Sequence, residues 1–381
     1  MTCNEIAKGL KSLAVFRCIL KNDIIKAFVE LCEEPCEDRL GAFGEKLYVK
    51  GDNISRAFLD VVLLSENLLS VRKACDEDIS GVILDRANKE LEIIKNAAET
   101  ESSVFSANNF WRVEQIDFEK EFMKRLNNIK STGYGVYAEN VMFTLEGREI
   151  VPAIFKDDTT VSSLKGYERQ RTQIENNLKA LLRGKVAANM LLYGDSGTGK
   201  SATIKALVNE YAPLGIRLIE IKKSQISDIP YIMGRVSNNP LKFVLFLDDL
   251  TFDPSDDAFG NMKAVLEGSV AARAKNTCIC VTSNRRHLVK ETMADREGGD
   301  LHRRDTMEEI GALTQRFGLS VVYEKPDRLS YIKVLTEIAA DFNVAITETE
   351  IKEAEAYAIS KGGRSCRVAK QYVEELIRRQ D

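Results

Sequence analysis

The stretch Gly194-Asp195-Ser196-Gly197-Thr198-Gly199-Lys200-Ser201 decides the fold, because it matches the pattern G-x-x-x-x-G-K-[ST] at every position. The short apolar run 190–193 precedes it, and residues 202–211 follow with the composition of a helix. Glycines let backbone N–H groups turn inward around an anion, and the N-terminus of the next helix adds partial positive charge. Strand, loop and helix in this order predict a phosphate-binding loop.

Two side chains of this loop have defined chemistry toward a nucleotide. Lys200 can reach the β- and γ-phosphates, and the Ser201 hydroxyl can ligate Mg²⁺. The backbone N–H groups of the preceding residues would surround the phosphates. The sequence therefore predicts a site for a nucleotide with Mg²⁺, formed by Gly194, Asp195, Ser196, Gly197, Thr198, Gly199, Lys200 and Ser201.

Two later apolar strands end in polar residues of the kind that a nucleotide-binding core needs. The run 243–247 is followed by Asp248 and Asp249, and the run 278–282 by Ser283 and Asn284. Asp248 would hold Mg²⁺ through water, and Asp249 could polarise the attacking water. Asn284 could hydrogen-bond the γ-phosphate or that water. The alternatives are a helix N-cap or solvated loop acid for either aspartate and a turn residue for Asn284.

Around these motifs, strands and helices alternate over residues 161–325. Alternation of this kind predicts a parallel sheet covered by helices, here with five strands at 190–193, 218–221, 243–247, 278–282 and 319–323. Residues 326–381 have no strand signal and divide into helical segments at 328–342, 348–361 and 364–379. The predicted fold class is therefore α/β, with a C-terminal helical lid.

The first 160 residues differ in character. Residues 1–130 have apolar residues three and four apart, which predicts a mostly helical region with Trp111 in its core. Residues 131–160 contain two strand-like runs around Glu146-Gly147-Arg148, which predict a small β-hairpin and a linker. Pro152 places the second strand at an edge, because proline cannot donate to a neighbouring strand.

Composition and charge exclude several classes of protein. The chain has 381 residues, 44% of them hydrophobic and 29% charged, which excludes disorder over most of its length. The formal net charge of −4 argues against coating nucleic acid through bulk charge. No apolar stretch approaches the roughly 18 residues that a membrane helix needs, and the N-terminus does not resemble a signal peptide. We expect a cytoplasmic protein without a membrane anchor.

The cysteines also point to a reducing compartment. All eight are spread through the chain and do not form a short secreted framework. Cys32 and Cys36 could be imagined as metal ligands, but cysteines four apart on a helix are more often small buried hydrophobes. Both histidines, His287 and His302, lie far away in sequence. We therefore favour core positions for this pair, and equally for Cys278 and Cys280.

Residues 160–380 resemble the AAA+ ATPases, and more narrowly a bacterial domain-of-unknown-function family of predicted AAA+ ATPases. The phosphate-binding loop (Walker A), the strand ending in Asp248 and Asp249 (Walker B) and a sensor-1-like Asn284 follow the family's order. Residues 315–318, Gln-Arg-Phe-Gly, look like the arginine-finger segment, and residues 362–369 look like the start of a sensor-2 helix. The resemblance implies ATP binding and hydrolysis.

The resemblance also implies roles for three further residues. Arg316 would reach the γ-phosphate of a neighbouring subunit, which implies a homo-oligomer, and Arg367 would close the lid over its own γ-phosphate. Tyr167 would pack beside the adenine. The alternatives are an ion pair of Arg316 with Glu308 or Glu309, a surface charge for Arg367 and an ordinary helix start at Tyr167.

The predicted function is an ATPase that couples ATP binding and hydrolysis to remodelling or regulation of a protein client. One alternative is a nucleotide-gated binding module with negligible turnover, because many AAA+ proteins have Glu where this chain has the shorter Asp249. The other is a nucleic-acid-associated loader or regulator. Its sequence features are Arg285-Arg286 and His302-Arg303-Arg304.

Overall fold

The computed structural model describes residues 2–107, 109–155, 157–252, 257–267, 275–284 and 315–380. The chain divides into two compact units, one formed by Met1–Glu139 with Asn238–Leu241 and one by Asn140–Ser237 with Lys242–Asp381. Several residues named above lie outside the described residues: Arg285, Arg286, His287, His302, Arg303, Arg304, Glu308 and Glu309.

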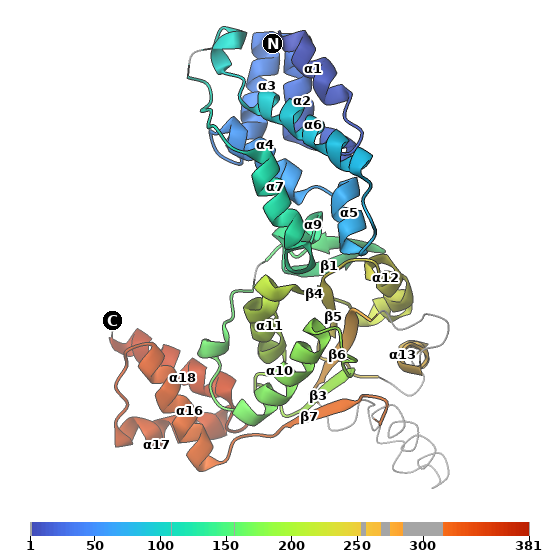
Figure 1. The fold of residues 1–381 in the computed structure, drawn as a ribbon. Coiled ribbons are helices and arrows are strands. Elements are labelled where there is room, and N and C mark those ends of the chain that lie inside the picture. The colour runs from blue at the N-terminus through green and yellow to red at the C-terminus, as the bar shows by residue number, and fades with distance from the viewer. Residues whose placement is uncertain are drawn as a thin grey trace. The chain divides into compact units, whose positions relative to one another are not determined.

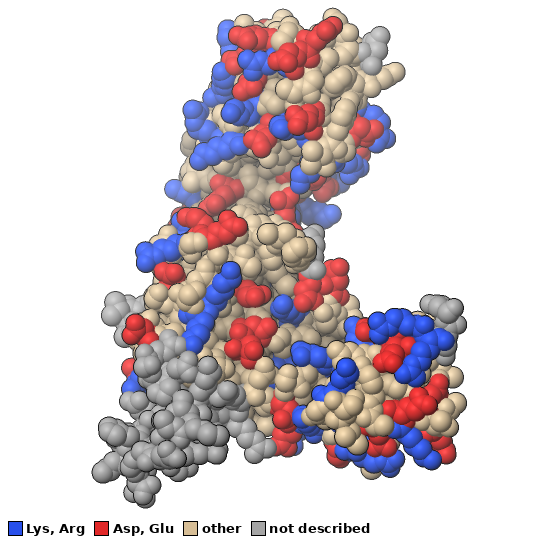
Figure 2. Space-filling model, turned by 180° about the vertical axis from the view of Figure 1, so that it is seen from behind, with Lys and Arg blue, Asp and Glu red and all other residues tan. Residues whose placement is uncertain are grey.

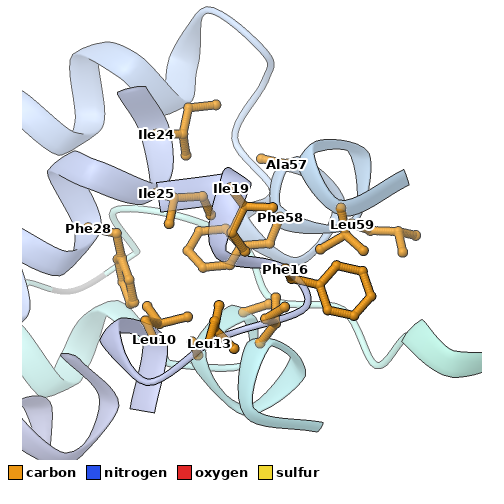
Figure 3. Close-up of a cluster of buried hydrophobic side chains, with 14 of the residues drawn as sticks. Leu10, Leu13, Phe16, Ile19, Ile24, Ile25, Phe28, Ala57, Phe58 and Leu59 are labelled. Carbon is orange, nitrogen blue, oxygen red and sulfur yellow. The ribbon is translucent and has the colours of Figure 1, made fainter. Parts of the chain in front are cut away.

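The N-terminal unit is helical, as the sequence predicts (Figure 1). Its core is aromatic: Phe28 packs edge-on against Phe58, and Phe43 against the buried Trp111, with ring centroids 5.2 and 5.1 Å apart. Figure 3 shows the part of this core around Phe16, Phe28 and Phe58. The helices are α1 (Cys3–Lys11), α2 (Asp23–Glu33), α3 (Glu37–Tyr48), α4 (Ile54–Leu64), α5 (Leu68–Ala74), α6 (Gly81–Ala98), α7 (Phe118–Asn127), α8 (Ile129–Thr132) and α9 (Val136–Glu139), with 3-10 turns η1 (Arg17–Lys21) and η2 (Ser102–Phe105).

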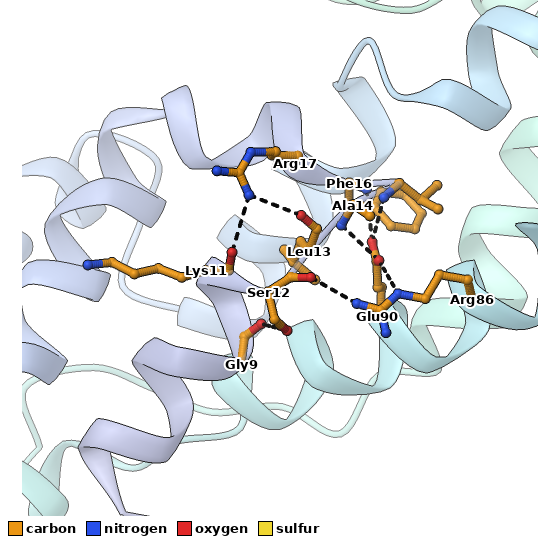
Figure 4. Close-up of polar contacts among 10 residues, drawn as sticks. Gly9, Lys11, Ser12, Leu13, Ala14, Phe16, Arg17, Arg86 and Glu90 are labelled. Atoms are coloured by element: carbon orange, nitrogen blue, oxygen red, sulfur yellow. Dashed lines mark hydrogen bonds and ion pairs between the residues drawn. The ribbon is translucent and has the colours of Figure 1, made fainter.

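One carboxylate is fully buried in this unit. Glu90 of α6 accepts hydrogen bonds from the backbone N–H groups of Ala14, Val15 and Phe16, at 2.8–3.0 Å, and from Nε of Arg86 at 2.6 Å (Figure 4). The segment between α1 and η1 has no helical partners for these N–H groups, so the carboxylate satisfies them. Glu90 thus fastens this segment to α6.

The prediction that Cys32 and Cys36 share a buried helical position is wrong for Cys36. Helix α2 ends at Glu33, and Cys36 is an exposed residue that precedes α3. The chain therefore turns between the two cysteines instead of continuing as one helix. Cys32, Cys278 and Cys280 are buried, as predicted.

The second unit is built on a seven-stranded sheet of order β2-β1-β4-β5-β6-β3-β7. The five strands predicted for the core are all parallel, which confirms the α/β class. The strands are β1 (Met142–Glu146), β2 (Glu149–Pro152), β3 (Met190–Gly194), β4 (Ile216–Glu220), β5 (Lys242–Leu247), β6 (Thr277–Ser283) and β7 (Leu319–Tyr323).

The predicted hairpin is present, but it continues the same sheet. Strand β1 pairs in parallel with β4 and antiparallel with β2, which therefore forms one edge of the sheet, with Pro152 at its end. The apolar sequence runs predict the two strands of the hairpin, but they do not indicate that β1 pairs with β4. The core is thus extended at the edge opposite β7.

Helices cover both faces of the sheet (Figure 1). Apolar residues of α10 and α11 pack in one cluster with alternate residues of the five core strands, while α12 and α13 lie on the other side. The helices of this layer are α10 (Glu168–Leu182), α11 (Lys200–Tyr211), α12 (Ile229–Val236) and α13 (Asp257–Glu267), with 3-10 turns η3 (Val161–Ser163), η4 (Ala212–Leu214) and η5 (Lys223–Asp228).

The C-terminal lid is a separate three-helix layer with its own small core. Helices α16 (Arg328–Asp341), α17 (Glu348–Ser360) and α18 (Cys366–Gln380) pack around the buried Tyr331 and Tyr372. Figure 2 shows Lys and Arg interspersed with Asp and Glu on the visible face of the lid. Such mixing gives little long-range steering of a charged partner. Among the residues that the structure describes, no helix is long and apolar enough to cross a membrane.

Candidate functional site

The loop after β3 has a backbone that requires its glycines. Gly194, Gly197 and Gly199 have φ values of 128°, 75° and 93°, in the region that L side chains rarely adopt. At Gly194 a Cβ would also collide with the backbone oxygen of Tyr323 on β7. The loop is tied to β7 by the N–H of Asp195, which donates to that same oxygen at 2.8 Å. The glycine pattern is therefore the cause of the loop's shape.

Lys200, the first residue of α11, is buried at the centre of the loop with 6% of its surface exposed. Its ammonium donates to the carbonyl oxygens of Gly194 (3.1 Å) and Asp195 (2.7 Å) and to Oδ1 of Asn284 (2.9 Å). Burial lowers the pKa of Lys200, while the carboxylates of Asp249, Asp195 and Asp248 oppose that shift. A buried cation thus lies at the end of β3, and the oxygens that hold it all belong to neutral groups.

Asp248 lies beside the Ser201 hydroxyl, as the Mg²⁺ prediction requires. Oδ1 of Asp248 accepts hydrogen bonds from Ser201 Oγ at 2.5 Å and from Thr282 Oγ1 at 2.6 Å. Magnesium is usually held by one or two protein oxygen ligands together with phosphate oxygens and water. The hydroxyl and carboxylate pair fits that donor set, so these residues are suitable for Mg²⁺.

Asp249 and Asn284 are in direct contact. Nδ2 of Asn284 donates to Oδ1 of Asp249 at 2.6 Å, while its Oδ1 accepts from Lys200. Asp249 has a φ of 49°, so its backbone is in the left-handed region. Asn284 therefore bridges the Lys200 ammonium and the Asp249 carboxylate. A single network joins the ends of β3, β5 and β6.

A cavity of about 690 Å³ opens in front of this network, between the core and the lid. Its volume lies within the range of ordinary ligand pockets. Tyr167 lines it just before α10, with φ 57°, and donates from its hydroxyl to the Glu324 oxygen at 2.5 Å. Its ring lies 5.1 Å from that of Tyr323, and burial raises the pKa of its hydroxyl.

The lid contributes the opposite wall of the cavity. Arg367 at the start of α18 lines it, and the backbone N–H of Arg367 donates to the Gly197 oxygen at 3.1 Å. Nearby, Lys165 forms an ion pair with Asp341 at 2.8 Å. Burial raises the pKa of the neighbouring Cys366 thiol to about 11. The C-terminal helices are therefore in direct contact with the loop after β3.

Arg316 does not belong to this cavity. It precedes β7, whose register with β3 pairs Met190 with Leu319, so Arg316 and the loop after Gly194 lie at opposite ends of these parallel strands. Its guanidinium forms an ion pair with Glu267, the last residue of α13. Of the residues predicted for the site, the structure brings together all except Arg316.

Thr282 and Lys325 make contacts in the site that the sequence does not predict. Thr282 bonds to both Walker-B acids, and its only signal is a hydroxyl residue near the end of the strand beside β5. Asp195, predicted as part of the loop, accepts at Oδ2 from the N–H of Lys325 (2.8 Å), whose Nζ donates to the Gly362 oxygen (2.7 Å). These last bonds connect the loop to the lid.

The chain belongs to the family described as "Protein of unknown function (DUF815)", which matches residues 138–380. The prediction of a domain-of-unknown-function family is thereby confirmed. None of the curated proteins matches this chain.

Two solved structures of AAA+ ATPases are similar to part of the chain. One is the Thermotoga maritima RuvB Holliday junction branch migration motor, with 14% identity and a TM-score of 0.37 over 57% of this chain and 63% of that one. The other is AMPPCP-bound DnaA from Aquifex aeolicus, with 18% identity and a TM-score of 0.40 over 58% of this chain and 65% of that one. This chain thus spans less than two thirds of either.

Proposed function

We propose that the second unit binds ATP with Mg²⁺ between the core and the lid and hydrolyses it, and that the accompanying lid movement acts on a protein partner. The observation that carries this proposal is the network of Lys200, Asn284, Asp249, Ser201 and Asp248. It lies along the wall of one cavity, at the carboxyl ends of parallel strands. Ligands of open α/β sheets bind at that edge.

The proposal of ATP binding rests on the partners of the buried Lys200 ammonium. The Lys200 ammonium is held by two backbone oxygens and one amide oxygen, all neutral groups. A phosphate group is anionic, so its oxygens accept stronger, charge-assisted hydrogen bonds. The N-terminus of α11 and the N–H groups of the loop add to the attraction. A triphosphate would therefore replace Asn284 at Lys200.

Mg²⁺ would be held by Ser201 and Asp248. When bound, the ion neutralises charge on the phosphate oxygens. The Ser201 hydroxyl donates to Asp248, so the hydroxyl and the carboxylate already lie side by side, where both could contact one ion. The two residues thus need no rearrangement of the backbone to act together.

Hydrolysis would use Asp249 and Asn284 on the water side. Once the Lys200 ammonium contacts phosphate, the Asn284 side chain can hold the attacking water. The water would then donate a hydrogen bond to the Asp249 carboxylate. Arg367 would stabilise the γ-phosphate from the lid. Arg316, at the far end of the strands, would serve the site of a neighbouring copy, which makes a homo-oligomer part of the proposal.

One observation favours a second candidate, a nucleotide-gated binding module. The short Asp249 carboxylate is already bonded to Asn284. If that bond persists with ATP bound, water is not activated, and the ATP state itself recruits the partner. Release of phosphate in the steady state distinguishes the two candidates.

The test is ATP binding by calorimetry and turnover by phosphate release, on the full chain with Mg²⁺. Lys200→Ala should lose ATP binding by about a hundredfold or more, because it removes a charge-assisted contact to phosphate. Lys179→Ala changes a lysine of α10 that does not line the cavity, so it serves as the control and should bind normally. Asp249→Asn should keep ATP binding and lose most turnover. Unchanged affinity in Lys200→Ala would overturn the nucleotide assignment.

A further inference from the structure

Thr282 near the end of β6 connects both Walker-B acids. Its side chain is 1% exposed. The hydroxyl donates to Oδ1 of Asp248 at 2.6 Å and accepts from the backbone N–H of Asp249 at 2.8 Å. Its own carbonyl oxygen accepts from the N–H of Leu250, also at 2.8 Å. A single residue thus holds three consecutive residues after β5.

The hydroxyl acts as both donor and acceptor in these contacts. It has one proton to donate, which goes to Asp248, and the Asp249 N–H meets a lone pair. The Ser201 hydroxyl donates to the same oxygen of Asp248. Two donors on Oδ1 fix the orientation of the carboxylate and leave Oδ2 for other partners.

The backbone of Asp249 explains why such a contact is needed. The last pair between β5 and β6 is Leu247 with Val281, so the two strands no longer form a ladder at Asp249. Its left-handed φ of 49° costs roughly 1–2 kcal/mol for an L residue, although Asp tolerates it better than most. The Thr282 hydroxyl replaces the missing strand partner for the Asp249 N–H and so stabilises this conformation. The side chain is thereby directed to Asn284.

We propose that Thr282 is a positioning residue for the acidic pair: its hydroxyl sets the orientation of Asp248 toward Ser201 and the backbone conformation that directs Asp249 to Asn284. This inference rests on the proposed function. Thr282 lines the cavity with only 1% of its surface exposed, and its hydroxyl contacts the two aspartates, through which it would act. Valine has nearly the same shape and fills the same place in β6, so the packing of the strand does not account for the hydroxyl.

The experiment compares Thr282→Val with the matched control Thr282→Ser, which keeps the hydroxyl. Measurements are the Mg²⁺ concentration for half-maximal effect, turnover, KM for ATP, ATP affinity in EDTA and thermal unfolding. Loss of a hydrogen bond behind a metal-ligating carboxylate typically costs about 10–100-fold in metal affinity or activity. Thr282→Val should therefore need about tenfold more Mg²⁺ and turn over about tenfold more slowly. Its KM and metal-free ATP affinity should stay near those of wild type, whereas its unfolding temperature should fall by about a few degrees, because the Asp249 N–H loses its acceptor.

Each other outcome is decisive. A Thr282→Val protein with wild-type Mg²⁺ dependence and turnover overturns the inference and leaves the proposed function intact. The inference fails equally if Thr282→Ser is as impaired, or if metal-free ATP affinity falls as much as the response to Mg²⁺, since the residue then only supports the fold. If the wild type binds ATP without turnover, the Mg²⁺ titration of binding decides. If the wild type binds no ATP, the proposed function fails, and this inference with it.

Discussion

Glu90 in the helical unit and Lys200 in the α/β unit are both buried charged side chains, but they are satisfied in different ways. Glu90 in the helical unit is 0% exposed and holds three backbone N–H groups and Arg86. Lys200 in the α/β unit is 6% exposed and donates to two backbone oxygens and to Asn284. The bonds of Glu90 close a gap in the fold, whereas those of Lys200 face a cavity. Burial of a charge alone therefore does not identify a functional site; what matters is whether its partners can be exchanged.

Arg316 provides the strongest test of this distinction. Its ion pair with Glu267 is either part of the fold or a contact that is exchanged for the phosphate of a neighbouring copy. If it acts on a neighbouring copy, Arg316→Ala should bind ATP normally and lose about a thousandfold or more in turnover. Phosphate release as a function of protein concentration measures this. Arg235→Ala, whose arginine pairs with Glu149 on the surface, is the control and should stay active.

Mixing two variants separates the roles further. Arg316→Ala combined with Lys200→Ala should regain part of the activity, because the second variant offers an intact Arg316 to a working site. Turnover that is independent of concentration in a strictly monomeric wild type would contradict the action in trans. Arg316 would then be a structural residue of the same kind as Glu90.

Glu90 should give the next largest effect, on stability. Glu90→Ala leaves three N–H groups, two of them buried, without their acceptor, so the free energy of unfolding of the helical unit should fall by about 3 kcal/mol or more. Denaturant unfolding followed by fluorescence reports on this unit, because Trp111 is the only tryptophan. Glu92→Ala on the same helix is exposed and should change little. A large loss of ATP affinity in Glu90→Ala would contradict a purely structural role.

The same contrast explains what the sequence could predict. The phosphate-binding loop is local, since its glycines and Lys200 lie within eight residues, and the Walker-B acids follow an apolar run directly. Glu90, by contrast, meets Ala14, Val15 and Phe16 across more than 70 residues of chain. No local pattern encodes such a contact.

Other differences between prediction and structure have the same physical cause. The hairpin runs predict β1 and β2, but their pairing with β4 depends on which sheet edge is open. Thr282 looks like an ordinary β-branched strand residue until its neighbour β5 is known. The prediction for Cys36, by contrast, fails on local sequence, because Pro35 cannot continue a helix and α2 ends at Glu33 before it. Periodicity predicts elements, whereas the partners of single polar groups depend on the complete fold.

Lys200 should give the smallest effect on stability, although it is central to binding. Burial lowers its pKa below the ordinary 10.5, so the native state holds its proton less tightly than the unfolded chain does. The unfolded state then binds more protons between the two pKa values, and stability rises with pH in that interval. At neutral pH the buried ammonium is a cost that its three neutral partners only partly offset. Lys200→Met keeps the side-chain volume and removes this cost, so the free energy of unfolding without ATP should change by less than about 1 kcal/mol.

The stability difference between wild type and Lys200→Met should also depend on pH, in a direction that the lowered pKa of Lys200 sets. As pH rises toward 10.5, the wild type should gain stability relative to Lys200→Met, because its ammonium loses the proton in the native state first. Denaturant unfolding followed by circular dichroism at several pH values measures the difference. If the free energy of unfolding of Lys200→Met is instead several kcal/mol lower than that of wild type at neutral pH, the contacts of Lys200 are structural, like those of Glu90. The cation would then be part of the fold and not a group held ready for phosphate.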